Sequence, residues 1–419
     1  MSEVGSSSRA GNLLRSGVLF SAAGFLAGLG NYAFQAVISR NMQASGEYGL
    51  ANSAFSLAML LSLPASIATF AVTHYIARFN FAGDETRLHQ LLAGCRKFLF
   101  HLTWTGSLLA LLLVKPISAF FGFPRSSLVL TIVFYVLALW WGAFATALCQ
   151  GLGWFKRLAA IGLGMVTVRV LLGFGASHWR MMAEVVVLIS AAGLLANLIL
   201  LRWRKQLALP SDHPESPWTP EFISFIFISL ACVGGGYCFM QGDQLVAKRY
   251  LGKEDLDAYT AAGLLARALP LTVAPLLTVL FTYRSGRQQA DDLREQLKLL
   301  ALYAGGLACG AAGLIALGGL CLKILNRYSP EVHAMLVPLS VTMVFVGLLQ
   351  SLAFWSLASR WSRLALLYGV LGLAYWLILL TFGTSLPALL RLMPVAAGVA
   401  FGGLLMVWLL AMRGKRSVN

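Results

Sequence analysis

The chain has 419 residues, of which 58 % are hydrophobic and 11 % are charged, and its formal net charge is +16. A soluble domain carries about 25 % charged residues, so this composition excludes a water-exposed surface of the same size. The basic residues punctuate long apolar runs, which favours topology signals and lipid-facing anchors and argues against nucleic-acid binding.

Twelve apolar runs are long enough to cross a bilayer, which needs about 20 apolar residues per helix. The basic N-terminal segment leads into a stretch too long for a signal-peptide core, so it predicts an uncleaved first helix. The runs are 13–39, 50–76, 94–114, 127–149, 158–176, 181–201, 221–245, 258–283, 299–320, 332–357, 364–383 and 389–411. The expected fold is therefore an all-α integral membrane protein of about 12 transmembrane helices.

The distribution of Lys and Arg predicts the orientation of these helices. With the N-terminus in the cytoplasm, twenty of these residues lie on the inner side and ten on the outer side. The remaining two, Arg169 and Arg267, fall inside apolar runs. The bias predicts that both termini are cytoplasmic.

The longest polar connection, 202–220, holds four prolines and divides the runs six and six. We interpret it as a cytoplasmic linker between an N-terminal six-helix lobe at 1–201 and a C-terminal one at 221–419. Five identical residues recur at an offset of 211, where Tyr48, Ala51, Leu60, Pro64 and Phe70 fall on Tyr259, Ala262, Leu271, Pro275 and Phe281. This recurrence predicts a parallel repeat of the kind found in several transporters.

Signatures of enzymatic chemistry are absent from the sequence, which has no HExxH, Walker loop or GxSxG motif. The six histidines show no metal-ligand spacing, and the six cysteines form no CxxC pair. No connection between runs exceeds about twenty residues, which leaves no room for a soluble catalytic domain. We expect a protein that is not an enzyme and has no metal or cofactor.

Polar side chains in the first run form a stripe, because Asn31, Gln35 and Arg40 are spaced by four and five residues. A stripe of this kind suits the lining of a cavity. At the inner ends of the second and eighth runs lie Arg78 and Arg284. These two either contact a substrate or only obey the positive-inside rule.

Charges inside apolar runs are costly and tend to face the bundle interior or a wet cavity. Arg169, in GMVTVRVLLGF, lies twelve residues beyond Arg157, which is about 18 Å along a helix and past the membrane midplane. Arg267, in AAGLLARALPLTV, falls in the outer half of the eighth run. Each arginine either faces a cavity and contacts substrate or snorkels to the outer interface.

Asp243, in YCFMQGDQLVAKRY, is an acidic residue at membrane depth and follows three consecutive glycines. It has three interpretations: it binds a coupling cation, pairs with Arg267, or marks the outer end of its helix. Pro64, Pro270 and Pro275 interrupt the backbone hydrogen bonding of the second and eighth runs, as gating kinks or as static ones.

The charges at membrane depth are mainly positive, which favours an anionic substrate such as a phosphate-linked lipid or an acidic glycan. The cavity of an organic-cation exporter would be expected to contain buried carboxylates and aromatic surfaces, which bind cations.

Three stretches carry a family resemblance: ISRNMQASGEYGLANSAFSLAMLLSLP, GDQLVAKRYLGKEDLDAYTAAGLLARALP and CQGLGWFKRLA. They resemble the polysaccharide-export, Wzx-type branch of the multidrug/oligosaccharidyl-lipid/polysaccharide (MOP) flippase superfamily. The resemblance implies two pseudo-symmetric six-helix lobes around a central cavity, in a bacterial inner membrane. Asp243 matches the family aspartate, and Arg40 and Arg249 match basic positions near the outer helix ends. Lipid II flippases of the superfamily tend to have two further C-terminal helices, so the resemblance favours a glycan other than lipid II.

The resemblance implies a flippase that moves a lipid-linked oligosaccharide, or assists polysaccharide export, by alternating access coupled to an H⁺ or Na⁺ gradient. Its expected partners are the anionic lipid-linked glycan, membrane lipids, and polymerase or synthase subunits, but no nucleic acid. Two alternatives stay open: a drug or metabolite antiporter of the same superfamily, and a non-transporting component or enzyme of a glycan synthesis complex.

Overall fold

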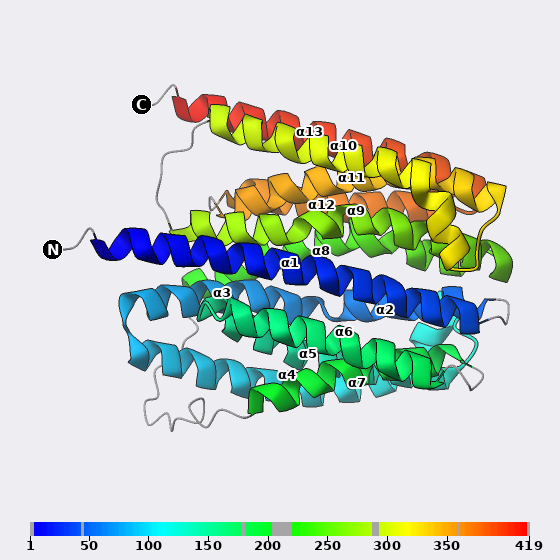
Figure 1. The fold of residues 1–419 in the computed structure, drawn as a ribbon, viewed down its shortest axis with the longest axis horizontal. Helices are drawn as coiled ribbons and strands as arrows, with labels where there is room; N and C mark the ends of the chain where they lie inside the picture. The colour runs from blue at the N-terminus through cyan, green and yellow to red at the C-terminus, as the bar shows by residue number, and fades with distance from the viewer. Residues whose placement is uncertain are drawn as a thin grey trace.

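Helices make up the fold of the residues that the computed structural model describes, which are 4–42, 46–176, 181–202, 220–286, 293–358 and 361–416. Thirteen helices occur in this part of the chain: α1 Val4–Asn41, α2 Glu47–Leu61, α3 Leu63–Ala82, α4 Glu85–Phe121, α5 Ser126–Gly151, α6 Phe155–Ala176, α7 Ala183–Arg202, α8 Pro220–Tyr250, α9 Lys253–Gly286, α10 Leu293–Ile324, α11 Pro330–Ala358, α12 Ser362–Phe382 and α13 Leu386–Arg416. They run alongside one another as a bundle (Figure 1), which confirms the all-α membrane fold expected from the apolar runs.

The helices form two groups, α1–α7 and α8–α13, which lie one above the other in Figure 1 and correspond to the two expected lobes. Both chain termini lie at the same end of the bundle, which we call the terminal end; the opposite end is the distal end. The expected linker at 202–220 falls, except for its first and last residues, outside the described residues. Its place between the lobes therefore stays a prediction.

One of the twelve expected crossings is divided into two helices, because α2 ends at Leu61 and α3 begins at Leu63. Pro64 lies in the first turn of α3, where its missing N–H leaves a helical hydrogen bond unmade. The hydroxyl of Ser62 donates to the carbonyl of Met59 at 2.8 Å and satisfies part of the broken end. The equivalent residue in the other lobe, Pro275, lies inside α9, which continues through it.

Within the second lobe, α8 and α12 cross with their backbones almost in contact. A Cβ atom added to Gly372 would lie 2.5 Å from the Cα of Gly235, and one added to Gly235 would lie 2.8 Å from the Cα of Gly369. Small residues of this kind allow helices in a membrane to approach closely. These three glycines fix α12 against α8, the helix that carries Asp243.

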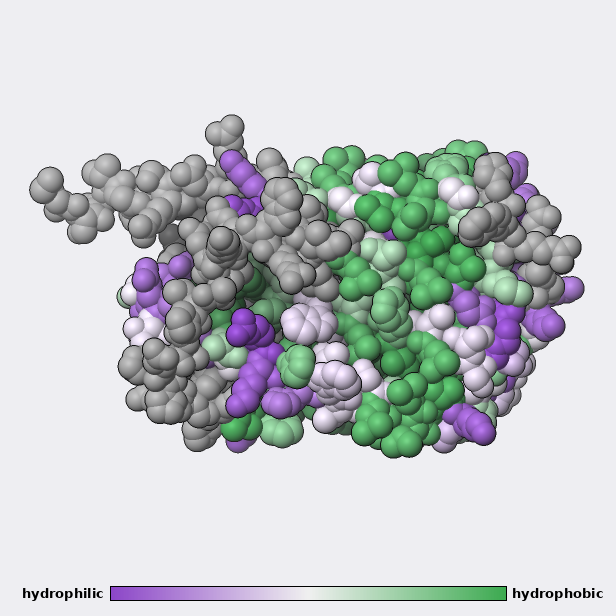
Figure 2. Space-filling model, turned by 90° about the horizontal axis from the view of Figure 1, so that it is seen from below, coloured by the Kyte–Doolittle hydropathy of each residue, from purple (hydrophilic) through white to green (hydrophobic). Residues whose placement is uncertain are grey.

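The outer surface is apolar around the middle of the bundle. On the face shown in Figure 2, hydrophobic residues occupy the middle and hydrophilic ones lie toward both ends. Along α4, Trp104, Leu108 and Leu112 are 66 %, 63 % and 71 % exposed, which only a lipid environment would tolerate over such a length. By length and composition, seven helices in the described part of the chain could span a membrane.

Candidate functional site

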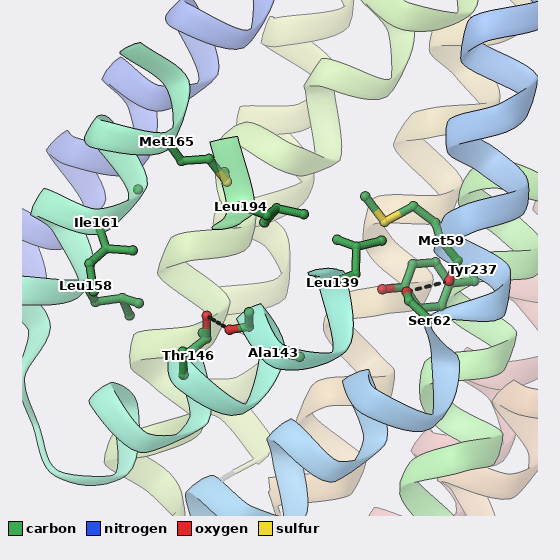
Figure 3. Close-up of a pocket in the computed structure, with 13 residues that line it drawn as sticks. Met59, Ser62, Leu139, Ala143, Thr146, Leu158, Ile161, Met165, Leu194 and Tyr237 are labelled. Atoms are coloured by element: carbon green, nitrogen blue, oxygen red, sulfur yellow. Dashed lines mark hydrogen bonds between the residues drawn. The ribbon is translucent and has the colours of Figure 1, made fainter. Parts of the chain in front are cut away.

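A cavity of about 260 Å³ lies beside the break between α2 and α3 (Figure 3). Its wall comes mostly from the first lobe, and Tyr237 of α8 reaches it from the second. The lining is largely apolar and consists of Met59, Ser62, Leu139, Gly142, Ala143, Ala145, Thr146, Leu158, Ile161, Gly162, Met165, Leu194 and Tyr237. The α5 and α6 residues in this set come from the halves of those helices nearer the terminal end, so the cavity lies on that side of the bundle.

Arg169 lies distal to this cavity and is not among the residues that line it. It lies on α6 four residues beyond Met165, and Tyr135 lies on α5 four residues before Leu139, so both are one helical turn distal to the lining. The Arg169 guanidinium donates from Nη2 to the Tyr135 hydroxyl at 2.9 Å and from Nη1 to Oδ1 of Asn31 at 3.2 Å. The structure thus brings together two predicted site residues, Arg169 and Asn31, from helices α6 and α1.

Among the residues that the structure describes, Arg169 has no carboxylate partner. A hydroxyl and an amide oxygen accept from it, and its Nε has no hydrogen-bond partner among the described residues. In contrast, Arg125 pairs with Glu47 and Glu184, each at 2.8 Å. A half-buried guanidinium of this kind can bind an anion, and the role of Arg169 as a substrate contact stays a prediction.

A second charge cluster is buried in the other lobe. Arg267 of α9 donates from Nη2 to Oδ2 of Asp243 at 2.5 Å and from Nε to the carbonyl of Met240 at 2.9 Å. The hydroxyl of Tyr259 donates to the same carboxylate oxygen. Asp243 is 0 % and Arg267 8 % exposed, so the two charges compensate each other away from water. Of the sequence interpretations of Asp243, the structure shows the pairing with Arg267; ion coupling stays a prediction.

Gln244 connects this cluster to the first lobe. Its Oε1 lies 3.4 Å from Nη1 of Arg267, and its Nε2 donates to the hydroxyl of Thr260 at 2.7 Å and lies 3.4 Å from that of Ser53 on α2. One helical turn away, Ser56 of α2 donates to Oε1 of Gln241 at 2.9 Å. Polar contacts between the lobes therefore run along α2 and α8.

Two predicted cavity arginines lie at the distal end, away from the cavity lining. Arg40 donates from Nε to the carbonyl of Ile324 at 2.9 Å, and Arg249 donates to the carbonyl of Phe120 at 2.7 Å while stacking 4.8 Å from its ring. Each of these bonds joins one lobe to the other. They place Arg40 and Arg249 in the distal seam, which we define as the lobe-to-lobe contacts at that end.

The other predicted residues are dispersed. Gln35 is half-buried and donates to Oδ1 of Asn52 at 3.3 Å, between α1 and α2. Arg78 is exposed near the terminal end of α3, and Pro64 is exposed at the start of that helix. Pro270 is buried within α9. The side chains of Arg284 and Pro275 lie outside the described residues.

Asp257 and Arg327 are interacting residues that sequence reasoning did not select. The carboxylate of Asp257 accepts from the backbone N–H groups of Gly46 and Gly49 and lies 3.2 Å from Nη1 of Arg327. Burial raises the pKa of the Asp257 carboxyl, and the two N–H donors and Arg327 act in the opposite direction. Asp257 precedes the apolar run at 258–283 and Arg327 follows the one at 299–320, so each looked like an ordinary loop charge.

No family model matches the sequence, and a search of curated proteins returns no match. The fold, in contrast, is similar to solved transporters of the MOP superfamily. An inward-facing multidrug resistance MATE family transporter matches with a TM-score of 0.70 at 14 % identity, over 93 % of this chain and 97 % of that one. An outward-facing MATE family transporter matches with 0.64 at 11 % identity, over 97 % and 96 %. The lipid II flippase MurJ, in an inward closed conformation, matches with 0.66 at 13 % identity, over 93 % and 87 %.

These likenesses establish that the chain has the fold of MOP-superfamily transporters, with two six-helix lobes.

Proposed function

We propose that this chain is a membrane transporter that flips an anionic, lipid-linked oligosaccharide by alternating access, as the Wzx-type resemblance implies. The observation that carries the proposal is Arg169, a cation without a carboxylate partner among the described residues, one helical turn from the end of an otherwise apolar cavity. A phosphate or pyrophosphate group bound by this guanidinium would leave its apolar and sugar portions toward the terminal side.

The volume of the cavity limits how much of the substrate can fit inside it. Its volume of about 260 Å³ is close to the lower end of ligand pockets, which run from about 300 to 1,000 Å³. It therefore suits only the few atoms of the substrate next to the phosphate group that Arg169 would bind, and a whole oligosaccharide would extend out of it. We propose that the glycan stays outside the cavity until the lobes rearrange.

The direction of transport follows from the predicted orientation. The Lys and Arg bias predicts that the terminal end lies in the cytoplasm. The lobes are joined at the distal end in this conformation, so a substrate synthesised on the cytoplasmic side would enter from the terminal side. If the lobes then separated at the distal end and joined at the terminal end, the substrate would be exposed to the opposite leaflet.

A reconstituted flipping assay tests the proposal. Proteoliposomes that contain only this protein are loaded with a fluorescent polyprenyl-pyrophosphate-linked oligosaccharide, and a membrane-impermeant reductant reports how much of it reaches the outer leaflet. We expect protein-dependent exchange that is lost when the pyrophosphate is replaced by a neutral linker. Equal exchange of the neutral analogue would contradict an anion-selective site, and no exchange of either would contradict the flippase.

A drug or metabolite antiporter is the second candidate, and the MATE transporters among the structural neighbours favour it. The cavity lining is a point against it, because the residues that the structure places there include no carboxylate for an organic cation. Uptake of a cationic dye by the same proteoliposomes, in exchange for H⁺ or Na⁺, would favour the antiporter. The assay with this protein alone also separates a flippase from a non-transporting component of a synthase complex.

A further inference from the structure

The N-terminus of α2 is capped by a residue of the other lobe. The N-cap position is Gly46, whose φ of 87° is left-handed and which has no side chain to accept a hydrogen bond. Ser, Thr, Asp or Asn normally supplies that acceptor from within the helix. Here Asp257 of α9 supplies it, with Oδ1 accepting from the N–H of Gly49 at 2.7 Å and Oδ2 from the N–H of Gly46 at 3.1 Å.

Glycine at both positions allows α9 to come close enough for this cap. A Cβ atom on Gly46 would lie 2.9 Å from the Cγ of Lys253, and one on Gly49 would lie 2.6 Å from the Cγ of Leu256. Lys253 and Leu256 belong to the first turn of α9, next to Asp257. The first residues of α2 and its N-cap therefore leave room for the start of α9.

Arg327, in the connection between α10 and α11, binds Asp257 and the distal end of α1. Its Nη1 lies 3.2 Å from Oδ2 of Asp257, its Nη2 donates to the carbonyl of Met42 at 2.8 Å, and its Nε lies 3.3 Å from the hydroxyl of Ser39. The guanidinium also stacks 5.4 Å from the ring of Tyr48. Asp257 and Arg327 are 5 % and 20 % exposed, so water competes weakly for these bonds.

Neighbouring bonds complete the distal seam. The hydroxyl of Ser39 donates to the carbonyl of Leu325 at 2.7 Å, and Nζ of Lys248 donates to the carbonyl of Gly122 at 2.9 Å. Both of these bonds, and those of Asp257 and Arg327, lie on the distal side of the α2–α3 break. The cavity lies on the terminal side, so these contacts join the lobes at the end of the molecule away from the cavity.

We propose that Asp257 and Arg327 form a latch that holds the lobes together at the distal end, and that the distal side opens when Asp257 releases the N-terminus of α2. This inference rests on the alternating access proposed above. Gly46 has no side-chain oxygen with which to replace the lost cap, so separation takes this acceptor away from the N–H groups of Gly46 and Gly49. A hydrogen bond to a charged group shifts an equilibrium by about tenfold or more, and the latch contains several.

The test measures the distance between the lobes at both ends of the purified full chain in lipid nanodiscs, with its six native cysteines replaced. Spin labels at Met182→Cys and Thr384→Cys report the distal end, and labels at Lys156→Cys and Arg363→Cys report the terminal end; all four residues are exposed. Double electron–electron resonance gives the populations of short and long distances in each pair. No substrate is needed, so the latch is tested separately from the proposed cargo.

Three variants are compared in this background. Asp257→Ala removes the acceptor, and we expect the ratio of distally closed to distally open molecules to fall by at least about tenfold, with a matching shortening at the terminal end. Arg327→Gln leaves the hydrogen bonds from the N–H groups of Gly46 and Gly49 to Asp257 in place. We therefore expect a smaller fall in the ratio of distally closed to distally open molecules. Asp255→Ala, an exposed position two residues earlier on α9, is the matched control and should leave both distances unchanged.

Two results would overturn the latch. One is an Asp257→Ala distribution identical to that of Asp255→Ala. The other, which decides the matter if Asp257→Ala does not fold, is an Arg327→Gln distribution identical to that control. In the first case, a lowered unfolding temperature of Asp257→Ala would show that the contact is structural and not a latch. Distal opening in Asp257→Ala together with failure of glycan flipping by the unmodified chain would leave the latch intact and reject the proposed cargo.

Discussion

Arg169 donates a hydrogen bond of 2.9 Å to the hydroxyl of Tyr135, and this bond joins α6 to α5 one helical turn beyond the cavity lining. Tyr135 is 2 % exposed, so its hydroxyl has a fixed position. The bond orients the guanidinium and leaves its positive charge in place. A carboxylate partner would neutralise that charge. A cation held in this way can accept an anionic ligand without first breaking an ion pair.

Tyr135→Phe should weaken transport of the anionic lipid-linked glycan while leaving the protein folded. The substitution removes one hydrogen bond to a charged group, which contributes about 1.5–3 kcal/mol, and lets Arg169 leave its productive orientation. We expect the flipping rate at low substrate concentration to fall by about tenfold or more. Tyr328→Phe, an exposed tyrosine at the distal end, serves as the control. Equal rates in the two variants would exclude a positioning role for Tyr135.

Removing one member of the buried pair should destabilise the second lobe. Asp243→Ala leaves the Arg267 guanidinium uncompensated at 8 % exposure, which costs about 3–5 kcal/mol. The unfolding temperature in detergent should fall markedly, and the double variant Asp243→Leu with Arg267→Met should recover much of it, because apolar side chains can replace an ion pair. A stable Asp243→Ala protein that has lost its response to an H⁺ or Na⁺ gradient would instead support the ion-coupling role.

The helices and their pairing into two lobes could be predicted from the sequence, because both follow from apolar length and from repeated residues. The expected second run at 50–76 is divided at Ser62 in the structure. Pro64 signalled an interruption, but Pro275 occupies the equivalent position inside a continuous α9. A proline removes one hydrogen bond in either lobe, and the neighbouring helices decide whether the backbone divides there.

The candidate site could be predicted only in part. Depth along a helix identified Arg169 and Arg267, since a charge at membrane depth is exceptional in any sequence. What distinguishes them is their partners, Asn31 and Tyr135 for one and Asp243 for the other, and these contacts depend on how separate helices pack. The latch was missed because Asp257 and Arg327 lie at helix ends, where charges are common and a contact over 70 positions leaves no local pattern.

The close crossing of α8 and α12 should not tolerate a larger residue. Gly372→Ala would place a Cβ atom 2.5 Å from the Cα of Gly235, so the helices must separate and the unfolding temperature should fall. Gly402→Ala is the matched control, because no atom lies within 4 Å of the Cβ that it adds. If the two variants unfold at the same temperature, α8 and α12 do not depend on this contact.

Acid should favour the distally closed form. In that form burial raises the pKa of the Asp257 carboxyl above its ordinary value of 3.8, with a further increase from Glu47, while Gly49, Gly46 and Arg327 lower it. In an open form water surrounds the carboxyl and its pKa returns to the ordinary value. The closed form therefore binds the proton more tightly than the open form. The resulting stabilisation of the closed form is complete below the ordinary pKa of the carboxyl, and it is lost as the pH rises through the raised pKa of the closed form.

The distal spin-label pair described above measures this dependence. The closed fraction of the unmodified chain should increase as the pH is lowered from neutral toward the ordinary pKa of the Asp257 carboxyl, 3.8. Asp257→Ala has no proton to gain at that position and should show no such increase. A closed fraction that decreases on acidification would mean that the charged carboxylate, and not its neutral form, is the better cap for α2.

The central claim is that Arg169 contacts the anionic group of the substrate, and reconstituted flipping of the pyrophosphate-linked oligosaccharide tests it most directly. Arg169→Gln should abolish protein-dependent exchange, and Arg169→Lys should retain part of it because a charge remains without the planar guanidinium. Arg363→Gln, at an exposed position on α12, is the matched control and should flip at the unmodified rate. Flipping by Arg169→Gln at the rate of Arg363→Gln would contradict the account.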